Sequence, residues 1–458
     1  MRSISEYIKG IMGRKDAVNM EEPGTCVLGI DFGSYKSKIT LAYRTTRYRQ
    51  PKVEIIRVPF QGGLDDPERP DTYSHPDSTY EFVAFAALEN GRLVPGRRSL
   101  LKDHSLPLKT IFIHSAGVTR ESTITRLPGG VDLLDHCSAG IITPEMETEV
   151  LKEHFELLRQ MAEAQAEATQ GGLRIIEVVL SYPNYLCPIE QEGDFIQYAS
   201  YYKKLLRPIW GKGIPFRLVS EGQAAALYVS EPFEDAQSAL ARNRLWGDLK
   251  DMDKSTGLSL LIPDGGSSSL NIQMQCVFFN EAGELASSQS ISGPDWLTGV
   301  QGGSHMSNFA VREMIVKTLS FHHPPGQIAT LLNDFERQKC QLDWTQSTKN
   351  AIHLHGTDPR FTVPIYPKAL QTAFDTAFSD GLVILEQEVR RVLDVGLDFV
   401  VILCGGSYFC KGLRNIIEEL MAEIEEEAQT RGIRVKHLFL AEYDVNWYGL
   451  STTFLLPL

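Results

Sequence analysis

The chain has 458 residues, of which 43% are hydrophobic and 22% are charged, so its length predicts two or more packed units and its composition is typical of a globular protein. The formal net charge of −13 argues against nucleic acid and anionic membranes as partners, because both bind positive surfaces. The seven cysteines are scattered without a CxxC pair, which argues against a disulfide framework or a zinc site and favours a reducing compartment.

The N-terminal stretch lacks the apolar core of a signal peptide, and no run approaches the ~20 apolar residues that span a bilayer. We therefore expect a protein of the cytosol or nucleus that makes no membrane contact. Residues 1–24 are expected to form a flexible leader.

The first strand-forming run, "CVLGID", ends at Asp31 and is followed by the turn "FGSYKS" and the alternating run "KITLAY". This order predicts a strand, a tight turn and a second strand. A dinucleotide site or a P-loop would instead place a helix after its glycine-rich turn, so neither is favoured. The run "KVEIIRVPF" predicts a third strand, and residues 61–79, rich in Asp, Pro and Gly, predict a loop.

A long helix is predicted over residues 143–172, with Thr143 as its cap, Pro144 in its first turn and a Gly-Gly pair at its end. The run "RIIEVVLSYP" then predicts a buried strand that stops at Pro183. Three further elements are expected in this half: a helix over 189–207, a strand over 216–220 and an alanine-rich helix from Glu221. Residues 231–256 are polar and charged, and we expect them to cross between two halves.

The second half repeats this pattern. "GLSLLIPD" ends at Asp264, a turn of small residues follows, and "LNIQMQCVFF" alternates again, so Asp31 and Asp264 occupy equivalent positions in two strand–turn–strand units. The elements expected after this unit are helices at about 305–320, 328–340 and 367–393, a buried strand "DFVVILCGGS" and an amphipathic acidic helix from Leu413. The chain is therefore predicted to be α/β with a duplicated half.

Six short stretches, taken in order, resemble the nucleotide-binding domain of the heat-shock-protein-seventy chaperones and the wider actin-like ATPase superfamily. They are "GIDFGSYKS", "VVLSYPNY", "LVSEGQAAALYV", "PDGGSSSLNI", "LNDFERQKC" and "ILCGGSYFCKGL". The resemblance implies a two-lobed actin-like (ribonuclease H-like) fold, in which each lobe is a mixed five-stranded sheet flanked by helices, with a nucleotide cleft between the lobes. On this basis lobe I is expected at 25–230, with a peripheral subdomain at about 61–137, and the crossing segment at 231–256. Lobe II is expected at 257–445, with a peripheral subdomain at about 298–380. A C-terminal segment at 446–458 is expected to return towards lobe I.

The resemblance also implies ATP or ADP with Mg²⁺ in that cleft. Turns rich in Gly and Ser can present successive backbone N–H groups to phosphate, and an acid at the base of each turn can hold the waters of Mg²⁺. Asp31 and Asp264 are the expected metal-side acids. The nucleotide-binding positions that match the family are Asp31, Gly33, Ser34, Tyr35, Lys36, Gly265, Gly266, Ser267, Ser268, Ser269, Gly302, Gly303, Glu336, Lys339, Gly405, Gly406, Ser407 and Phe409.

Three residues are expected in catalytic roles by the same resemblance. Glu221 matches the carboxylate that positions metal-bound or attacking water, and Lys109 aligns loosely with a lysine that offsets charge on the transferred phosphoryl group. Asp264 is the third. Two of these residues have a simpler alternative, because Glu221 could be a helix-start acid favoured by the dipole and Lys109 a solvated lysine. Among the nucleotide-binding positions, Glu336 with Lys339 could be a surface ion pair.

The chain also departs from the family pattern. In the second phosphate loop, Ser267 and Ser268 stand where the family has glycines, and Asn271 replaces its closing acid. Phe409 stands where an arginine would stack on adenine. Because loss of one preorganised charge or donor costs about 10²–10³ in rate, we expect nucleotide binding with slow or impaired hydrolysis.

Three functions remain open at this stage. The first is a chaperone-like ATPase whose lobes close on Mg-ATP; the peptide-binding domain and lid of true chaperones do not follow Leu458 in the sequence, so peptide refolding by this chain alone is not expected. The second is a pseudo-ATPase scaffold that acts through protein partners such as co-chaperones. The third is a small-molecule kinase of the same superfamily, for which no sugar-binding acid stands out.

The histidine pairs at 322–323 and 353/355 are not expected to bind metal, because no carboxylate or cysteine lies at ligand spacing.

Overall fold

The computed structural model describes residues 24–34, 36–45, 52–59, 82–96, 105–118, 121–169, 171–186, 192–230, 249, 252, 257–279, 285–290, 297–319, 326–345, 351–356 and 361–440. Several sequence predictions lie outside these residues. They are the leader before Gly24, Tyr35, the loop at 61–79, nearly all of the crossing segment 231–256, and the C-terminal segment 446–458.

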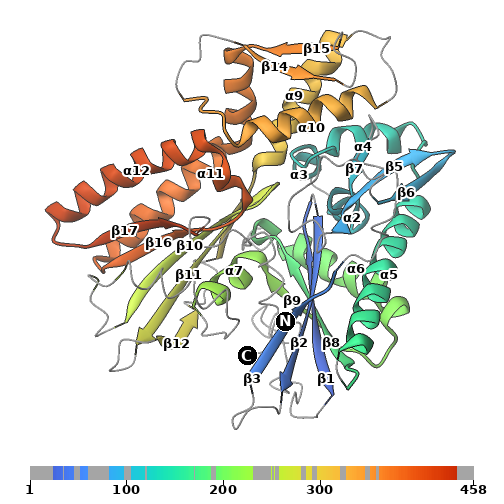
Figure 1. Ribbon diagram of the computed structural model, residues 1–458, viewed down its shortest axis with the longest axis horizontal. Helices are drawn as coiled ribbons and strands as arrows, with labels where there is room; N and C mark the ends of the chain where they lie inside the picture. The colour runs from blue at the N-terminus through green and yellow to red at the C-terminus, as the bar shows by residue number, and fades with distance from the viewer. Residues whose placement is uncertain are drawn as a thin grey trace.

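Two six-stranded mixed sheets form the body of the protein (Figure 1). The first has the order β3-β2-β1-β8-β9, and its sixth strand, β4, pairs with β2. Its strands are β1 (Thr25–Phe32), β2 (Lys36–Thr45), β3 (Lys52–Arg57), β4 (Phe82–Val83), β8 (Arg174–Tyr182) and β9 (Phe216–Ser220). β1 pairs antiparallel with β2 and parallel with β8.

The second sheet has the order β12-β11-β10-β16-β17, and its sixth strand, β13, pairs with β11. Its strands are β10 (Leu258–Gly265), β11 (Ser269–Phe279), β12 (Leu285–Ser290), β13 (Leu297–Gln301), β16 (Phe399–Leu403) and β17 (Val435–Phe439). β10 pairs antiparallel with β11 and parallel with β16, so the two sheets share one strand order and one set of directions.

The two central hairpins also share their register. Asp31 pairs with Lys38 across β1 and β2, and Asp264 pairs with Asn271 across β10 and β11. In each hairpin the acid is the penultimate residue of its strand and its partner lies seven residues further along. Lys38 and Asn271 are therefore structural equivalents.

Helices cover both sheets, which confirms the predicted α/β class. The described helices are α2 (Leu108–Ser115), α3 (Glu121–Thr125), α4 (Gly130–Ser138), α5 (Pro144–Ala168), α6 (Glu192–Trp210), α7 (Glu221–Ser230), α9 (Ser304–Leu319), α10 (Gln327–Lys339), α11 (Pro367–Val395) and α12 (Lys411–Thr430). α5 begins as predicted, because the Thr143 side chain accepts a hydrogen bond from Met146 N at 3.4 Å and Pro144 occupies the first helical position.

The apolar side chains form three clusters that explain the continuous hydrophobic runs of the central strands. Along β1, Leu28 and Ile30 face the core under α2, α5 and α6, whereas Val27 faces the region between the sheets. β16 alternates in the same way. Val401 packs in the core between the second sheet and its covering helices, and Val400 packs in a third cluster, here called the shared cluster, to which both sheets contribute. Because successive strand side chains point to opposite faces, a strand buried on both faces is apolar throughout.

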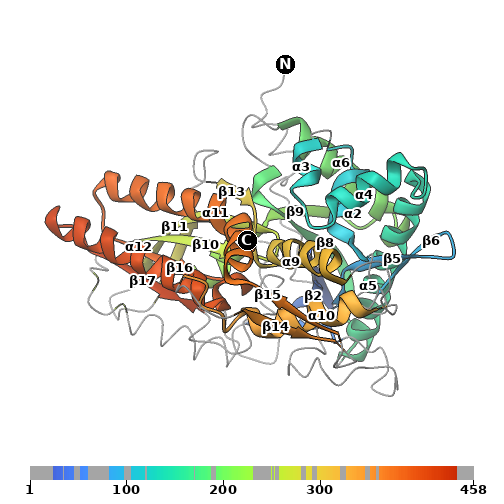
Figure 2. The same cartoon turned by 90° about the horizontal axis from the view of Figure 1, so that it is seen from above.

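The shared cluster packs around α7, which contacts strands of both sheets and lies between them (Figure 1). Two smaller sheets stand at the periphery. One contains β5 (Phe85–Glu89), β6 (Arg92–Pro95) and β7 (Ser105–Pro107), and the other contains β14 (Ile352–His355) and β15 (Thr362–Ile365). Viewed from above, α9 and α10 lie beside the helices of the first half (Figure 2). No helix in the described ranges has the length and apolar character needed to cross a bilayer.

Candidate functional site

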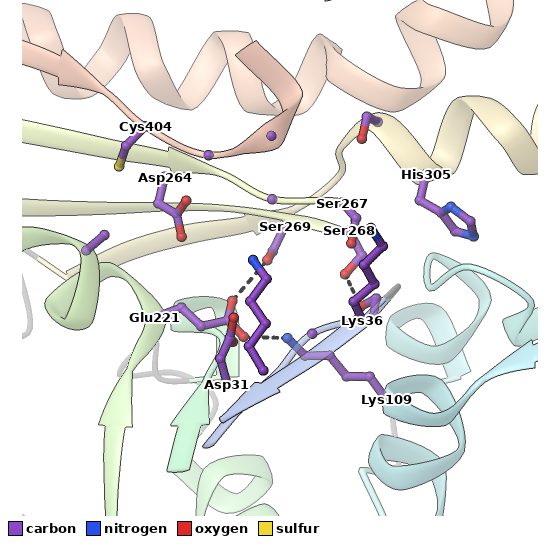
Figure 3. A pocket seen from close by; sticks show the side chains of 18 of the residues that line it. Asp31, Lys36, Lys109, Glu221, Asp264, Ser267, Ser268, Ser269, His305 and Cys404 are labelled. Atoms are coloured by element: carbon purple, nitrogen blue, oxygen red, sulfur yellow. Dashed lines mark hydrogen bonds and ion pairs between the residues drawn. The ribbon is translucent and has the colours of Figure 1, made fainter. Parts of the chain in front are cut away.

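A cavity of about 270 Å³ lies where the turns after β1 and β10 meet, close to the lower end of the range of about 300–1,000 Å³ for ligand pockets. Both halves contribute side chains to it (Figure 3). Its lining comprises Asp31, Gly33, Ser34, Lys36, Lys38, Lys109, Glu221, Ala225, Asp264, Gly266, Ser267, Ser268, Ser269, Ser304, His305, Glu336, Lys339, Cys340, Cys404, Gly405, Gly406 and Cys410.

The two turns are built alike. A Cβ on Gly33 would lie 2.5 Å from the Lys36 carbonyl oxygen, and a Cβ on Gly266 would lie 3.2 Å from that of Ser269, three residues further on in each case. The turns also touch, because the buried hydroxyls of Ser34 and Ser268 hydrogen-bond to each other. The two turns therefore face each other in the folded protein, although Ser34 and Ser268 are 234 residues apart in the sequence.

The two turn aspartates project into the same space, and Figure 3 shows the Asp264 carboxylate directed towards the side of the cavity that holds Asp31 and Glu221. Ser181 Oγ donates to Asp31 Oδ1 at 3.1 Å and accepts a hydrogen bond from Phe32 N at 3.3 Å. Burial, followed by the charges of Glu221 and Asp31, raises the pKa of Asp264 to about 8. The charges of Glu221 and Asp31 thus disfavour the ionised form of Asp264, and a cation at this point would favour it.

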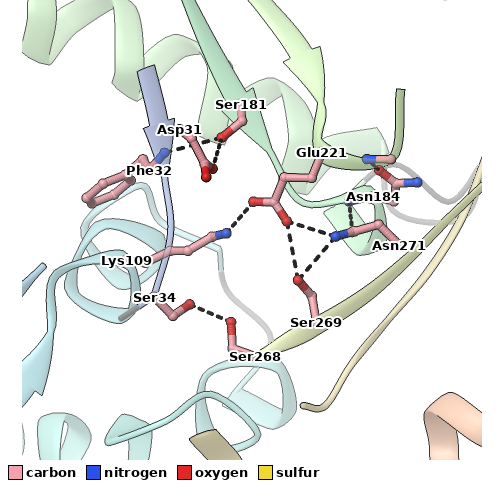
Figure 4. A network of polar contacts seen from close by, with 11 residues as sticks. Asp31, Phe32, Ser34, Lys109, Ser181, Asn184, Glu221, Ser268, Ser269 and Asn271 are labelled. Carbon is pink, nitrogen blue, oxygen red and sulfur yellow. Dashed lines mark hydrogen bonds and ion pairs between the residues drawn. The ribbon is translucent and has the colours of Figure 1, made fainter. Parts of the chain in front are cut away.

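Glu221 is the centre of a buried polar network (Figure 4). It begins α7 directly after β9, and its Oε1 accepts a hydrogen bond from Lys109 Nζ, with Lys109 only 3% exposed. Its Oε2 accepts from Asn271 Nδ2 at 2.9 Å and from Ser269 Oγ at 3.3 Å. Lys109 is therefore not a solvated lysine, and both carboxylate oxygens of Glu221 already have partners.

Asn184 ties this network to both halves. Its backbone N–H donates to Asn271 Oδ1 at 2.8 Å, and its own Oδ1 accepts from the backbone N–H of Gly222 at 3.1 Å. Its Nδ2 donates to the carbonyl oxygens of Ile272 and Thr298 on the second sheet. Because one amide side chain links the start of α7 to β11, the position of Glu221 depends on how the two halves meet.

A second polar group lies at the α10 side of the cavity. Lys339 is 2% exposed and pairs with Glu336 at 2.6 Å, so this is not a surface ion pair. Lys339 Nζ also donates to Ser304 O and Asn308 Oδ1, both at 3.1 Å. The positive charge of Lys339 and hydrogen bonds from Lys339 and Asn308 hold the pKa of Glu336 below its usual value despite burial.

The glycines predicted to bind nucleotide divide into two groups. Gly405 and Gly406 line the cavity, and Gly405 has φ +100°, where an added Cβ would meet Gly265 O at 2.5 Å. Gly302 and Gly303 instead lie behind the second turn, where Gly302 N donates to Ser268 O at 3.0 Å and a Cβ on Gly303 would meet Gly266 O at 2.4 Å. These two glycines support the turn from behind and are not part of the cavity wall.

Three other predicted positions also lie outside the cavity lining. Gly265 and Ser407 line a separate hollow of about 30 Å³ behind the second turn, and Ser407 Oγ donates to Gly266 O at 2.5 Å. Phe409 ends the short 3-10 turn η6 (Gly406–Phe409) and is not among the lining residues of either space. The aromatic ring of Phe409 therefore does not line the cavity.

Sequence reasoning missed several lining residues. Lys38 could have been found, because it has the register position equivalent to Asn271. His305, whose pKa burial lowers to about 4, follows the supporting glycine pair and carries no motif. Cys340 and Cys410 both line the cavity, and a hydrogen bond from the Cys410 thiol lowers the pKa of Cys340. They are 70 residues apart in the sequence, and no sequence pattern pairs them.

Neither protein-family models nor curated proteins match this chain. The functional assignment therefore depends on the cavity itself: its paired turns, its facing carboxylates and its buried lysines. The lining residues come from seven separate segments of the chain, and they meet only in the folded protein.

Proposed function

We propose that this protein binds Mg²⁺-ATP or Mg²⁺-ADP between its two halves and hydrolyses ATP slowly, as a chaperone-like member of the two-lobed actin-like ATPase superfamily. The observation that carries the proposal is the pair of facing hairpins with one register, each with an aspartate at its base. The identical order and directions of the two sheets support the same reading.

The phosphate side of the cavity has the required chemistry. Lysines 36, 38 and 109 line it together with the hydroxyls of Ser34 and Ser267–Ser269. Hydroxyls and turn N–H groups donate to phosphate oxygens, and the ammonium groups offset their charge. A polyanion entering here would separate Ser34 from Ser268 and give each hydroxyl a phosphate oxygen as its new acceptor.

The residues present also fit Mg²⁺. Asp31, Glu221 and Asp264 supply carboxylate oxygens, the ligand type that this hard cation prefers. Burial and the charges of the other two acids raise the pKa of Asp264 although Lys38 and Lys109 act in the opposite direction, so a further cation beside Asp264 would favour its ionised form. Bound Mg²⁺ would offset the charge of the phosphate oxygens; Asp31 and Asp264 are the residues that would hold it, directly or through water.

The nucleoside would lie towards α10 and the η6 turn. Lys339 and Glu336 offer charged hydrogen-bonding groups for ribose hydroxyls, and Gly405 and Gly406 leave space for a planar base against the backbone. The absence of Phe409 from this wall argues against aromatic stacking as part of the recognition.

The Glu221 network favours slow turnover. A carboxylate that positions attacking water must have a lone pair available to it, yet three of the roughly four acceptor sites of Glu221 are taken by Lys109, Asn271 and Ser269. The same observation favours the second candidate function, a pseudo-ATPase scaffold that uses nucleotide weakly or not at all and acts through protein partners. The two candidates differ in turnover.

Binding is tested by calorimetric titration of the full chain with ATP and ADP, each with Mg²⁺ and with a chelator. Ligand at 100 times Kd should also stabilise the fold by about 2.7 kcal/mol. Asp264→Asn should weaken Mg²⁺-dependent binding, whereas the control Asp375→Asn, at an exposed position on α11, should not. Failure of both nucleotides to bind at millimolar concentration would refute the proposal, and phosphate release would separate the slow ATPase from the scaffold.

A further inference from the structure

Three metal-ligating side chains meet away from the nucleotide cavity, at the junction of α2, α4 and α5. His114 is in the last turn of α2, Cys137 in the last turn of α4, and Glu147 in the first turn of α5. One ligand atom from each lies within 4.8 Å of the other two. The ends of three helices thus bring an imidazole, a thiol and a carboxylate to one point.

The contacts converge on a single oxygen. His114 Nδ1 lies 2.6 Å from Glu147 Oε1, and Cys137 Sγ donates to that same oxygen at 3.7 Å. The other carboxylate oxygen, Glu147 Oε2, accepts a hydrogen bond from Ser115 Oγ at 2.8 Å. Ser115 therefore orients the carboxylate so that Oε1 faces the two other ligands, which is the role of an outer-shell partner in metal sites.

We propose that His114, Cys137 and Glu147 bind a zinc ion, with water as the fourth ligand. Nitrogen, thiolate and carboxylate ligands together suit Zn²⁺, whereas Mg²⁺ and Ca²⁺ prefer oxygen alone. A neutral imidazole, a thiolate and a carboxylate balance the two charges of the ion, so the loaded site is neutral. Neutrality matters here because Glu147 is only 2% exposed.

The site is accessible from one side. Glu147 is buried, but His114 is 28% exposed and Cys137 is half-buried, so an ion and its water can reach the open position. A His–Glu ion pair would by itself explain two of the three residues. It does not explain why the Cys137 thiol lies against the same carboxylate oxygen.

Zinc at this point would fix α2 against α4 and α5. α2 also carries Lys109, the partner of Glu221, at its opposite end. The zinc proposal stands independently of the nucleotide proposal, because its ligands and its test involve no residue of the nucleotide cavity.

The test is a zinc titration of the full-length protein against a chromophoric chelator, with no nucleotide present. We expect one equivalent of Zn²⁺ to bind, and Co²⁺ to give a thiolate-to-cobalt charge-transfer band when it replaces zinc. Cys137→Ser should abolish the band, and both it and His114→Gln should weaken zinc binding by more than about 100-fold, beyond the loss of an outer-shell partner.

Cys276→Ser is the matched control, because Cys276 is also half-buried and also contacts an oxygen, Ser259 Oγ, at 3.8 Å. This variant should bind zinc like the parent. Sub-stoichiometric zinc binding by the parent protein, or equal affinity in the parent and Cys137→Ser proteins, would overturn the proposal. Circular dichroism spectra of all variants would establish that each remains folded.

Discussion

The Ser34 and Ser268 hydroxyls hydrogen-bond to each other across the meeting point of the two hairpin turns, and both are almost fully buried. Ser34 follows β1, and Ser268 precedes β11. This contact links the turns of the two halves directly. It also occupies the position that a phosphate group would take if one entered between the turns.

This contact can be measured by a double-mutant cycle. Ser34→Ala or Ser268→Ala leaves one buried hydroxyl without its partner, which should cost about 1–3 kcal/mol of unfolding free energy. The double variant should lose less than the sum of the two, with a coupling of about 0.5 kcal/mol or more. Urea unfolding gives all four values, and Ser138→Ala, at an exposed serine on α4, is the control. Additive losses would show that the hydroxyls do not interact.

Much of the fold could be predicted because its signals are local. The alternation and length of the runs around Asp31 and Asp264 predicted the two hairpins, and Thr143 with Pro144 predicted the start of α5. Burial of both faces made the strand of Val400 and Val401 continuously apolar. These features depend on neighbours within a few residues along the chain.

What could not be predicted depends on contacts between distant segments. Asn184 interacts with Gly222 and Asn271 through hydrogen bonds that exist only when the halves meet. His114, Cys137 and Glu147 have no recognisable spacing, and the sequence argued against a zinc site because it contains no CxxC pair. For the same reason Lys109 could be taken for a solvated lysine until its partner, Glu221, was known.

The Lys109–Glu221 pair should be important for the stability of the fold. Lys109→Met leaves the buried carboxylate without its cation, which typically costs about 3–5 kcal/mol. Lys109→Met combined with Glu221→Gln should recover part of that loss, because no unpaired charge then remains. Chemical unfolding at neutral pH tests this order of stabilities. If Lys109→Met alone were as stable as the parent, the pair would not be buried as described.

The raised pKa of Asp264 predicts a pH dependence. The native state holds this proton up to about pH 8, whereas the unfolded chain releases it near 3.8, so the native state binds more protons between these values. The contribution of Asp264 is therefore fully present below about pH 4 and is lost as the pH rises through about 8.

Asp264→Asn should flatten this part of the stability profile, as measured by urea midpoints at pH 5, 6, 7 and 8 without divalent ions. Millimolar Mg²⁺ should stabilise the parent most at the upper end of this range, where Asp264 is ionised and available to a cation. A parent profile identical to that of Asp264→Asn would contradict the assignment.

The sharpest test of the Glu221 network is Asn271→Asp, which changes an amide to an acid at a position with no solvent exposure. Asn271 Nδ2 now donates to Glu221 Oε2 at 2.9 Å, and an aspartate would place a second carboxylate there. We expect a loss of about 3–5 kcal/mol at pH 7, the cost of an uncompensated buried charge. Part of the lost free energy of unfolding should be regained at pH 5, where one of the two acids takes up a proton.

Asn415→Asp is the matched control for this variant. Asn415 Nδ2 donates to Asp343 Oδ2 at 2.7 Å, but the residue is half-exposed. Water should therefore limit the loss of unfolding free energy in Asn415→Asp to about 1 kcal/mol. Equal losses in the two variants would mean that Glu221 and Asn271 are not in the dry, tightly bonded arrangement on which slow turnover is argued.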